Sequence, residues 1–249
     1  FAAKDEGIVD SIGLIAEADL SGVDCVVVSS TVLSSITLLK NILDRNDLLA
    51  NAVVIDVGSV KELILKSVSL HSKFNQFIGC HPMAGSEKKG YGNGRADLYE
   101  KSCVIITPNA HNKQEDIEKI EIFWRMLGAR TARLDAAIHD KIVAKTSHLP
   151  HMSACVLVDL VMELEQEIGA KAVHYGIGKG YRDTTRIAAG SEEVWTEIAA
   201  LNTENIANAI DGMIERLFNL KKMILNAKQN PQELNEYLAR IRKHREEIN

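Results

Sequence analysis

Two short runs of β-branched residues limit the folds that this chain can adopt. The first, DCVVVSS, begins at Asp24, and the second, AVVIDVGS, begins at Ala52. Both are largely apolar, as strands are when both faces of a parallel sheet are covered. The segment between them, TVLSSITLLKNILDR, repeats its apolar residues at the helical period. A strand, a helix and a second strand in this order predict a βαβ unit, and therefore a parallel sheet with helices on its faces.

The same alternation continues along the chain to about residue 135. Three further strands are predicted by the runs FIGC, SCVIITP and ARTARLD, and two further helices by VKELILKSV and EDIEKIEIFWRMLG. We therefore expect residues 1–137 to form a doubly wound, mostly parallel α/β domain of the Rossmann type, which binds dinucleotides.

After Asp135 the strand patterns stop and helical periodicity takes over. A long helical tract begins at Ala136, and a second stripe of apolar residues extends through 206–224. Long apolar faces on a short helical segment favour self-association, because one chain cannot cover all of them. We expect residues 138–249 to form an all-α domain that dimerises.

One feature of a dinucleotide-binding domain is absent from the sequence. Such a domain opens with a strand, a glycine-rich turn and a helix that together hold the pyrophosphate, yet no GxGxxG occurs here. The opening residues, FAAKDEGIVDSI, resemble the tail of a helix followed by a loop. We expect that a first βαβ unit of about 40–50 residues precedes them in the natural chain. The alternative is a degenerate fold.

Composition excludes several classes of function. The chain of 249 residues carries a net charge of -5, so we expect no nucleic-acid partner. No apolar run approaches the roughly 18 residues of a membrane span, and no signal-peptide pattern opens the sequence. The four cysteines lack metal-type or disulfide-type spacing, which indicates reduced thiols in a cytoplasmic protein.

The segment DVGSVK, Asp56 to Lys61, is the first of four candidate sites. It lies at the carboxyl end of a predicted strand, where open α/β sheets bind their ligands. Gly58 would allow a tight turn, and Ser59 would cap the helix that follows. The alternative is a capped turn that binds nothing.

The second candidate is HPMAGSEKKG, which begins at His81 and also follows a predicted strand. Pro82 fixes the backbone and biases His81 towards an extended conformation, which would aim the imidazole into a crevice. Glu87 would orient the ring or tune its pKa. The alternative is a structural histidine that caps a loop.

The third candidate is SHLPH, Ser147 to His151. Two histidines three residues apart suggest a metal, but no third ligand stands at a suitable distance, so we predict none. If Pro150 starts or kinks a helix, Ser147, His148 and His151 lie near exposed backbone N–H groups, which favour an anionic ligand. Histidines that are merely packed are the third interpretation.

The fourth candidate is GKGYRDTTRIAAGSEEVW, Gly178 to Trp195. Arg182 and Arg186 lie in a segment without a clean helical stripe, and arginine is the side chain best shaped to bind carboxylates in bidentate fashion. Asp183 would pair with one arginine and leave the other for a ligand. The alternative is a solvated loop of ion pairs.

Five stretches, in this order, resemble the prephenate dehydrogenase family of tyrosine biosynthesis, which includes the arogenate dehydrogenases: DVGSVK, HPMAGSEKKG, LYEKSCVIITP, SHLPH and YRDTTRIAAGSEEVW. The resemblance extends from about Gly22 to Asn205. It implies a nucleotide-binding α/β domain, a helical dimerisation domain, a homodimer, and NAD as cofactor with NADP possible. The implied reaction is oxidative decarboxylation of prephenate, in which a hydride leaves ring carbon 4 for NAD(P)+ and carbon dioxide leaves carbon 1.

The resemblance also implies roles for individual residues. His81 would hydrogen-bond the C4 hydroxyl and help to remove its proton, Ser59 would share this contact, and Glu87 would support the network. Arg186 would bind the ring carboxylate, and His151 would contact the substrate side chain.

Further residues receive roles in the same way. Trp195 would lie close to the active site of the partner subunit and, with Ser86, would contact the substrate. Ser147 would lie between substrate and nicotinamide, and we assign Ser29 and Asp56 to the cofactor as well.

Several alternatives stay open at this point. The substrate is prephenate or arogenate, the cofactor is NAD or NADP, and any tyrosine inhibition would act at or near the active site. A catalytically silent ligand-binding dimer is an alternative of a different class. A third is a β-hydroxyacid dehydrogenase with a catalytic lysine in the helical domain, near Lys141 or Lys145.

Overall fold

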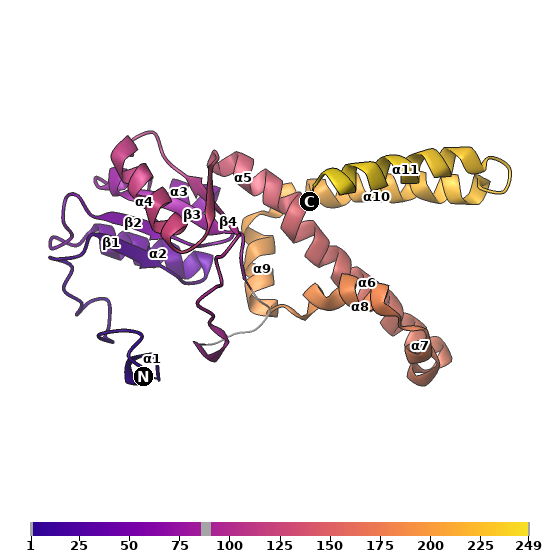
Figure 1. Cartoon of the computed structure of the whole chain (residues 1–249), viewed down its shortest axis with the longest axis horizontal. Coiled ribbons are helices and arrows are strands. Elements are labelled where there is room, and N and C mark those ends of the chain that lie inside the picture. The colour runs from indigo at the N-terminus through magenta and orange to yellow at the C-terminus, as the bar shows by residue number, and fades with distance from the viewer. Residues whose placement is uncertain (1, 86–90, 249) are drawn as a thin grey trace. The chain divides into compact units, whose positions relative to one another are not determined.

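The computed structural model describes residues 2–85 and 91–248 (Figure 1). The chain forms two compact units, Phe1–Thr203 and Glu204–Asn249. The first unit contains the sheet and most of the helices, and the second is a pair of helices.

Five strands form one sheet in the order in which they occur in the chain: β1 Cys25–Val28, β2 Val53–Asp56, β3 Phe77–Pro82, β4 Cys103–Thr107 and β5 Arg130–Arg133. Neighbouring strands are parallel except β3 and β4, which are antiparallel. The predicted mostly parallel sheet is therefore confirmed.

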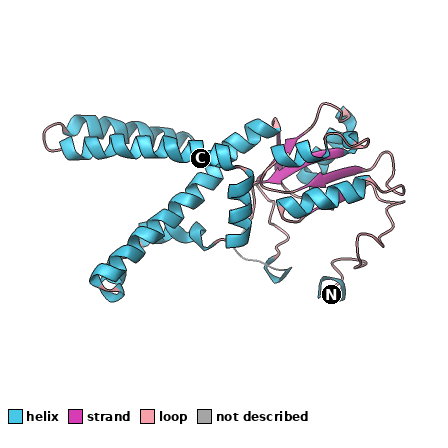
Figure 2. Ribbon diagram, turned by 180° about the vertical axis from the view of Figure 1, so that it is seen from behind, coloured by secondary structure: helices cyan, strands magenta, loops and turns pink. Residues whose placement is uncertain are grey.

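Helices cover both faces of this sheet (Figure 2). Along β2, Val54 packs into one apolar cluster together with α2 (Val32–Leu43) and α3 (Glu62–Val68). Its neighbours Val53 and Ile55 belong to a second cluster, which contains residues of α4 (Gln114–Met126). Because successive side chains of a strand point to opposite faces, this alternation confirms the doubly wound arrangement. Short helical elements complete the region: α1 Ala2–Asp5, η1 Phe74–Gln76 and η2 Tyr91–Asn93.

Strand β3 is longer than the sequence predicted. The apolar run ends at Cys80, yet His81 pairs with Ile105 and Pro82 with Val104 of the antiparallel strand β4. The partner strand extends the ladder beyond the apolar residues, so His81 is held within a sheet rather than at the start of a loop.

The helical tract after the sheet begins with α5, Ala136–Val143. The carboxylate of Asp135 caps it by accepting the N–H groups of Ala137 and Ile138. A π-helical turn, η3 Ala144–His148, then leads into α6, Leu149–Ile168. The remaining elements of the first unit are α7 Ala170–Gly176, α8 Lys179–Thr185, η4 Arg186–Ala189 and α9 Glu192–Leu201.

Pro150 lies in the first turn of α6, as predicted, but the expected exposed helix terminus is not found. Pro150 is the second residue of α6, but the chain enters it directly from the π-helical turn, where the N–H of Leu149 donates to the carbonyl of Ala144. Proline has no N–H of its own, and the widened turn takes up this gap without ending the helix. No free helix terminus is therefore exposed to an anion here.

The second unit consists of α10, Thr203–Asn226, and α11, Pro231–Glu247, which lie side by side in Figures 1 and 2. Large apolar side chains stay more than a third exposed on both helices, among them Ile214, Leu217, Phe218, Leu225 and Ile241. Within residues 2–85 and 91–248, no helix combines the length and the apolar character needed to cross a membrane.

Candidate active site

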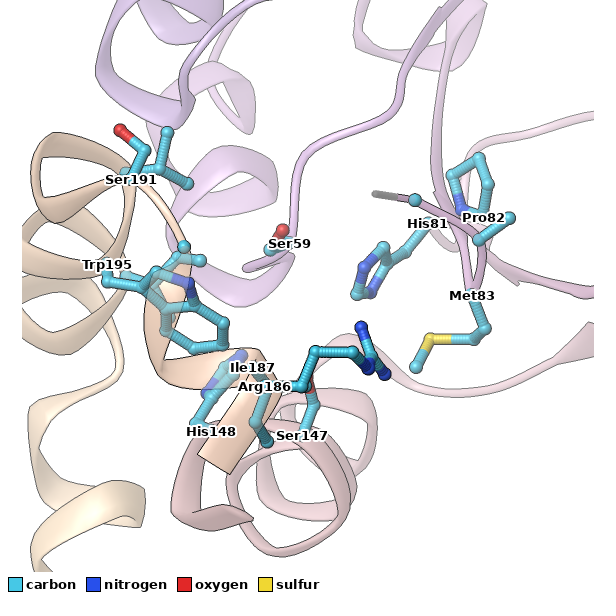
Figure 3. A pocket seen from close by; sticks show the side chains of 15 residues that line it. Ser59, His81, Pro82, Met83, Ser147, His148, Arg186, Ile187, Ser191 and Trp195 are labelled. Carbon is cyan, nitrogen blue, oxygen red and sulfur yellow. The ribbon is translucent and has the colours of Figure 1, made fainter. Parts of the chain in front are cut away.

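A cavity of about 500 Å³ opens where the carboxyl ends of β2 and β3 face the later helices of the first unit (Figure 3). It brings together five of the residues predicted from the sequence, which are Ser59, His81, Ser147, Arg186 and Trp195. Ser86 and Glu87 lie outside the described residues.

His81 is the chemically distinctive residue of this cavity. Its side chain is 9% exposed, and Figure 3 shows the imidazole pointing into the space between Ser59 and Arg186. The pKa of His81 lies well below its ordinary value, chiefly because burial disfavours the cation and because Lys61 adds positive charge nearby. The ring is therefore neutral at physiological pH and available as a base.

The floor beneath His81 contains two residues that sequence patterns did not single out. Nδ1 of His81 lies 2.8 Å from Nε2 of His139, and Nδ1 of His139 lies 2.7 Å from Oδ1 of Asp140. His139 and Asp140 are 0% and 1% exposed. Both belong to the ordinary-looking helical segment AAIHDKIV, so only the packing of α5 against the sheet reveals them.

Asp140 also caps a helix that is remote in sequence. Its Oδ1 accepts the N–H of Lys61 at 2.8 Å, and its Oδ2 accepts the N–H of Glu62 at 3.0 Å. The sequence predicted Ser59 as this cap, and that prediction was wrong, because α3 begins at Glu62 and its first N–H groups are taken by Asp140. Ser59 instead lines the cavity.

A fully buried ion pair lies under the same floor. The ammonium of Lys61 contacts Oδ2 of Asp56 and donates to the carbonyl of Cys80 at 2.7 Å. The N–H of Gly58 donates to Oδ2 of Asp56 at 2.8 Å. Asp56 was predicted to contact the cofactor, but its side chain is 0% exposed and lines no described cavity. Its position beneath the strand ends fits a role in holding Lys61 and the turn.

The histidines of SHLPH lie differently from the prediction. His148 lines the cavity, whereas His151 is 4% exposed and stacks on Trp195, with ring centroids 3.6 Å apart. A glycine at position 190 permits this stack, since a Cβ there would lie 2.4 Å from Nε1 of Trp195. His151 thus supports Trp195, and its predicted contact with the substrate side chain stays a prediction.

Of the two histidines, His148 is the one that lines the cavity. It is 1% exposed, and among the described residues its Nε2, like Nδ1 of His151, has no hydrogen-bond partner. Burial lowers the pKa of His148 to about 4, against a smaller opposing effect of Asp140. In the part of the chain that the structure describes, no three His, Cys, Asp or Glu side chains gather so as to hold a metal ion.

The rim of the cavity is formed by η4 and α9. Arg186 is the first residue of η4, and Figure 3 shows its exposed side chain extending towards His81. Trp195, on α9, lines the cavity of its own chain. The resemblance had implied a position near the active site of a partner subunit.

A second cavity of about 240 Å³ adjoins the first and shares Ser59 with it. It lies at the carboxyl ends of β1 and β2, the edge of an α/β sheet where nucleotides bind, and it includes the predicted cofactor residue Ser29. Small residues, among them Ser30 and Gly58, line it and leave room for a ligand close to the backbone.

Glu197 of α9 closes one side of this second cavity. Its two carboxylate oxygens accept the N–H groups of Val32 and Leu33, each at 2.9 Å, and so cap α2. The side chain of Thr31, which precedes α2, makes no capping bond. A sequence pattern could not reveal this cap, because 165 residues separate Val32 from Glu197.

Comparison with known families gives two adjoining matches. Residues 2–133 match the nucleotide-binding domain of prephenate dehydrogenase, and residues 135–240 match its dimerisation domain.

Individual proteins resemble the chain over most of its length. Cyclohexadienyl dehydrogenase of Zymomonas mobilis is 32% identical over 174 residues, which is 70% of this chain and 59% of that protein. Prephenate dehydrogenase of Bacillus subtilis is 27% identical over 228 residues, which is 90% of this chain and 60% of that protein. The chain thus spans less than two thirds of the length of these relatives.

A solved structure shares the fold. The crystal structure of prephenate dehydrogenase from A. aeolicus, in complex with hydroxyphenyl propionate and NAD+, is 31% identical to this chain. The TM-score is 0.87, and the match covers 100% of this chain and 85% of the other.

Proposed function

Because this chain belongs to the prephenate dehydrogenase family, we propose that it catalyses the oxidative decarboxylation of prephenate to 4-hydroxyphenylpyruvate in tyrosine biosynthesis. The hydride passes to NAD+. The observation that carries the proposal is the neutral, buried imidazole of His81 in a cavity that also contains Ser59 and Arg186. Arogenate, which differs from prephenate in the side chain, is the alternative substrate.

The chemistry places one clear demand on the protein. As the hydride leaves carbon 4, the bond between carbon 1 and its carboxylate breaks, and the released electron pair completes the aromatic ring. The C4 hydroxyl becomes more acidic as the hydride departs, so a neutral base that accepts its hydrogen bond lowers the barrier. His81 fits this role, and Ser59 lies where it can share the contact (Figure 3).

Recognition of the substrate carboxylates falls to the rim in this proposal. Arg186 presents a guanidinium, whose fork of N–H groups matches a carboxylate. Nε2 of His148, which has no hydrogen-bond partner in the part of the chain that the structure describes, belongs to the lining of the same cavity. Trp195 supplies an apolar surface for the ring and is itself supported by the stacked His151.

The second cavity fits the nicotinamide end of a dinucleotide. It is bounded by small residues at strand ends, and it meets the first cavity at Ser59, so that a hydride acceptor there would adjoin the substrate. Ser29 and Ser147 would contact this end of the cofactor. NAD+ is the cofactor in the A. aeolicus crystal structure, and NADP+ is the alternative here.

We further propose that the chain acts as a cytoplasmic homodimer with its domain boundary near residue 137. The match to a dimerisation domain supports self-association, as do the exposed apolar residues of α6 and α10, for example Leu160 and Phe218. Any inhibition by tyrosine would use the cavity, because tyrosine has the same phenol ring and side-chain carboxylate as the product 4-hydroxyphenylpyruvate.

The experiment that tests this function is an absorbance assay of NAD(P)H with the natural full-length protein. Prephenate and arogenate are each supplied with NAD+ and with NADP+. We expect absorbance to rise fastest with prephenate and NAD+, and a faster rise with arogenate would select the alternative. A folded protein that binds both ligands but forms no reduced cofactor in any combination would support a silent ligand-binding dimer instead.

A further inference from the structure

A row of buried polar groups leads from the first turn of α3 to the cavity. We propose that Asp140 and His139 are positioning residues that fix His81 in the tautomer protonated at Nδ1, so that Nε2 presents its lone pair to the substrate hydroxyl. The tautomer follows from the hydrogen-bond geometry around a neutral His139, and its catalytic consequence rests on the proposed function.

The direction of the row is set at Asp140. Its two oxygens accept backbone N–H groups from Lys61 and Glu62, at 2.8 and 3.0 Å, and a backbone N–H can only donate. The first turn of a helix also favours a negative charge. Asp140 therefore acts as an acceptor towards its remaining neighbour, which is Nδ1 of His139 at 2.7 Å.

The second step follows from the chemistry of a neutral imidazole, which has one donor and one acceptor nitrogen. Since Nδ1 of His139 donates to Asp140, its Nε2 carries the lone pair. That lone pair faces Nδ1 of His81 at 2.8 Å, so the proton of this contact belongs to His81. Nε2 of His81 is then unprotonated.

Burial gives the row its rigidity. His139 and Asp140 are at most 1% exposed and His81 is 9% exposed, so little water competes for these hydrogen bonds. The members come from three separate elements, α5, β3 and the start of α3. A neutral histidine in water exchanges between its two tautomers, whereas this arrangement favours the one with an unprotonated Nε2, the nitrogen that does not face His139.

Nuclear magnetic resonance tests the inference directly in the wild-type protein. The full-length protein is labelled with ¹⁵N in its imidazole rings, and the signals of His81 are assigned by their loss in His81→Asn. We expect a protonated Nδ1 and an unprotonated Nε2 for His81, and a protonated Nδ1 with an unprotonated Nε2 for His139. A proton on Nε2 of His81, or a doubly protonated His139, would overturn the inference.

Two variants of His139 link the tautomer to turnover. His139→Leu removes the acceptor, so we expect kcat to fall about 10–100-fold, as for other residues that orient a reacting group, with little change in KM or in the Kd for NAD+. His139→Gln keeps a side-chain oxygen that can accept from Nδ1 of His81, and should restore part of kcat. An unchanged kcat in His139→Leu, with the tautomer of His81 preserved, would contradict the proposed positioning of His81 by Asp140 and His139, which we call the relay.

The relay and the proposed function can fail separately. The expected tautomer in a protein that oxidises neither substrate would refute the function and leave the relay standing. Turnover of prephenate by a protein whose His81 is protonated at Nε2 would refute the relay and leave the function standing. If His139→Leu does not fold, the wild-type spectrum still decides the structural part.

Discussion

The floor and the rim of the cavity are built in different ways. In the floor, His81, His139 and Asp140 are buried and joined by hydrogen bonds between elements that are remote in sequence. In the rim, Arg186 is exposed and Trp195 is half-buried, and both come from neighbouring short elements. A floor shielded from water can fix the positions of protons, whereas an accessible rim can admit and sort ligands. We therefore expect substitutions in the floor to change kcat, and those in the rim to change KM.

The largest effect is expected at the point where the floor meets the substrate. His81→Asn removes the base but keeps a polar side chain of similar reach, so kcat should fall about 10²–10⁴-fold. The Kd for NAD+, measured by fluorescence titration, should stay within the error of the wild-type value. A variant that turns over at the wild-type rate would remove His81 from the mechanism and erase the contrast with the rim.

The rim predicts the opposite kinetic pattern. Arg186→Ala should raise KM for the substrate about 10–100-fold, the loss of a charged hydrogen bond, with a smaller change in kcat. Arg186→Lys, which keeps the charge without the fork, should recover only part of the affinity. Arg182→Ala is the matched control, because Arg182 is an exposed arginine of α8 that does not line the cavity. Equal effects of the two alanine variants would argue against a carboxylate clamp.

Three carboxylates that cap helices extend the comparison of buried with exposed groups to the free energy of unfolding. Asp140 is buried, Glu197 is half-buried and Asp135 is exposed, and each accepts two backbone N–H groups. Asp140→Ala should lower the free energy of unfolding by about 2–3 kcal/mol, because buried donors lose their acceptor. Glu197→Ala should cost about 1 kcal/mol, and Asp135→Ala less.

Urea titration of the three alanine variants measures these differences. The ranking follows from burial, so an Asp135→Ala variant as unstable as Asp140→Ala would show that burial does not govern the strength of these caps.

The last prediction concerns acid. Unfolded His148 binds a proton near its ordinary pKa of 6.5, while folded His148 resists until its lowered pKa of about 4. Between these values the unfolded state holds more protons, so the free energy of unfolding rises with pH and is lost on acidification. This histidine contributes at most about 1.4 kcal/mol per pH unit. The free energy of unfolding, measured by urea titration from pH 4.5 to 7, should rise less steeply with pH in His148→Asn than in the wild type. Equal slopes in the two proteins would contradict this account.

The sheet and its helices could be predicted because their signals are local. The run AVVIDVGS contains β2, a strand covered on both faces, and the run VKELILKSV that follows it contains α3. The length of β3 could not be predicted in this way, because its last pair, Pro82 with Val104, depends on a partner strand that lies 22 residues further along the chain.

The contents of the cavity were predicted less completely than the fold. His81, Ser59 and Arg186 stood out because glycines, prolines and polar residues cluster around them after apolar runs. His139 and Asp140 lie in a regular amphipathic helix, and no local pattern separates them from other polar residues. Their environment arises only when α5 docks on the strand ends, which a pattern of period 3.6 does not encode.

The positions of the two histidines of SHLPH depend on local helix geometry. The chain enters α6 through the π-helical turn at Ala144–His148, which the sequence did not predict. A widened turn changes the direction in which the side chains after it project, so a helix that begins or kinks at Pro150 was not enough to place His148 and His151.

The capping of α2 and α3 has a consequence for how this family can diversify. Both helices belong to residues 2–133, yet the carboxylates that cap them, Glu197 and Asp140, belong to residues 135–240. Consider a chimera that joins the first segment of one homologue to the second segment of another. Both caps would form only if the second segment carried an acidic residue at the positions of Asp140 and Glu197. The two segments are therefore less interchangeable than their separate folds suggest, and recombination between them would be filtered by two side chains.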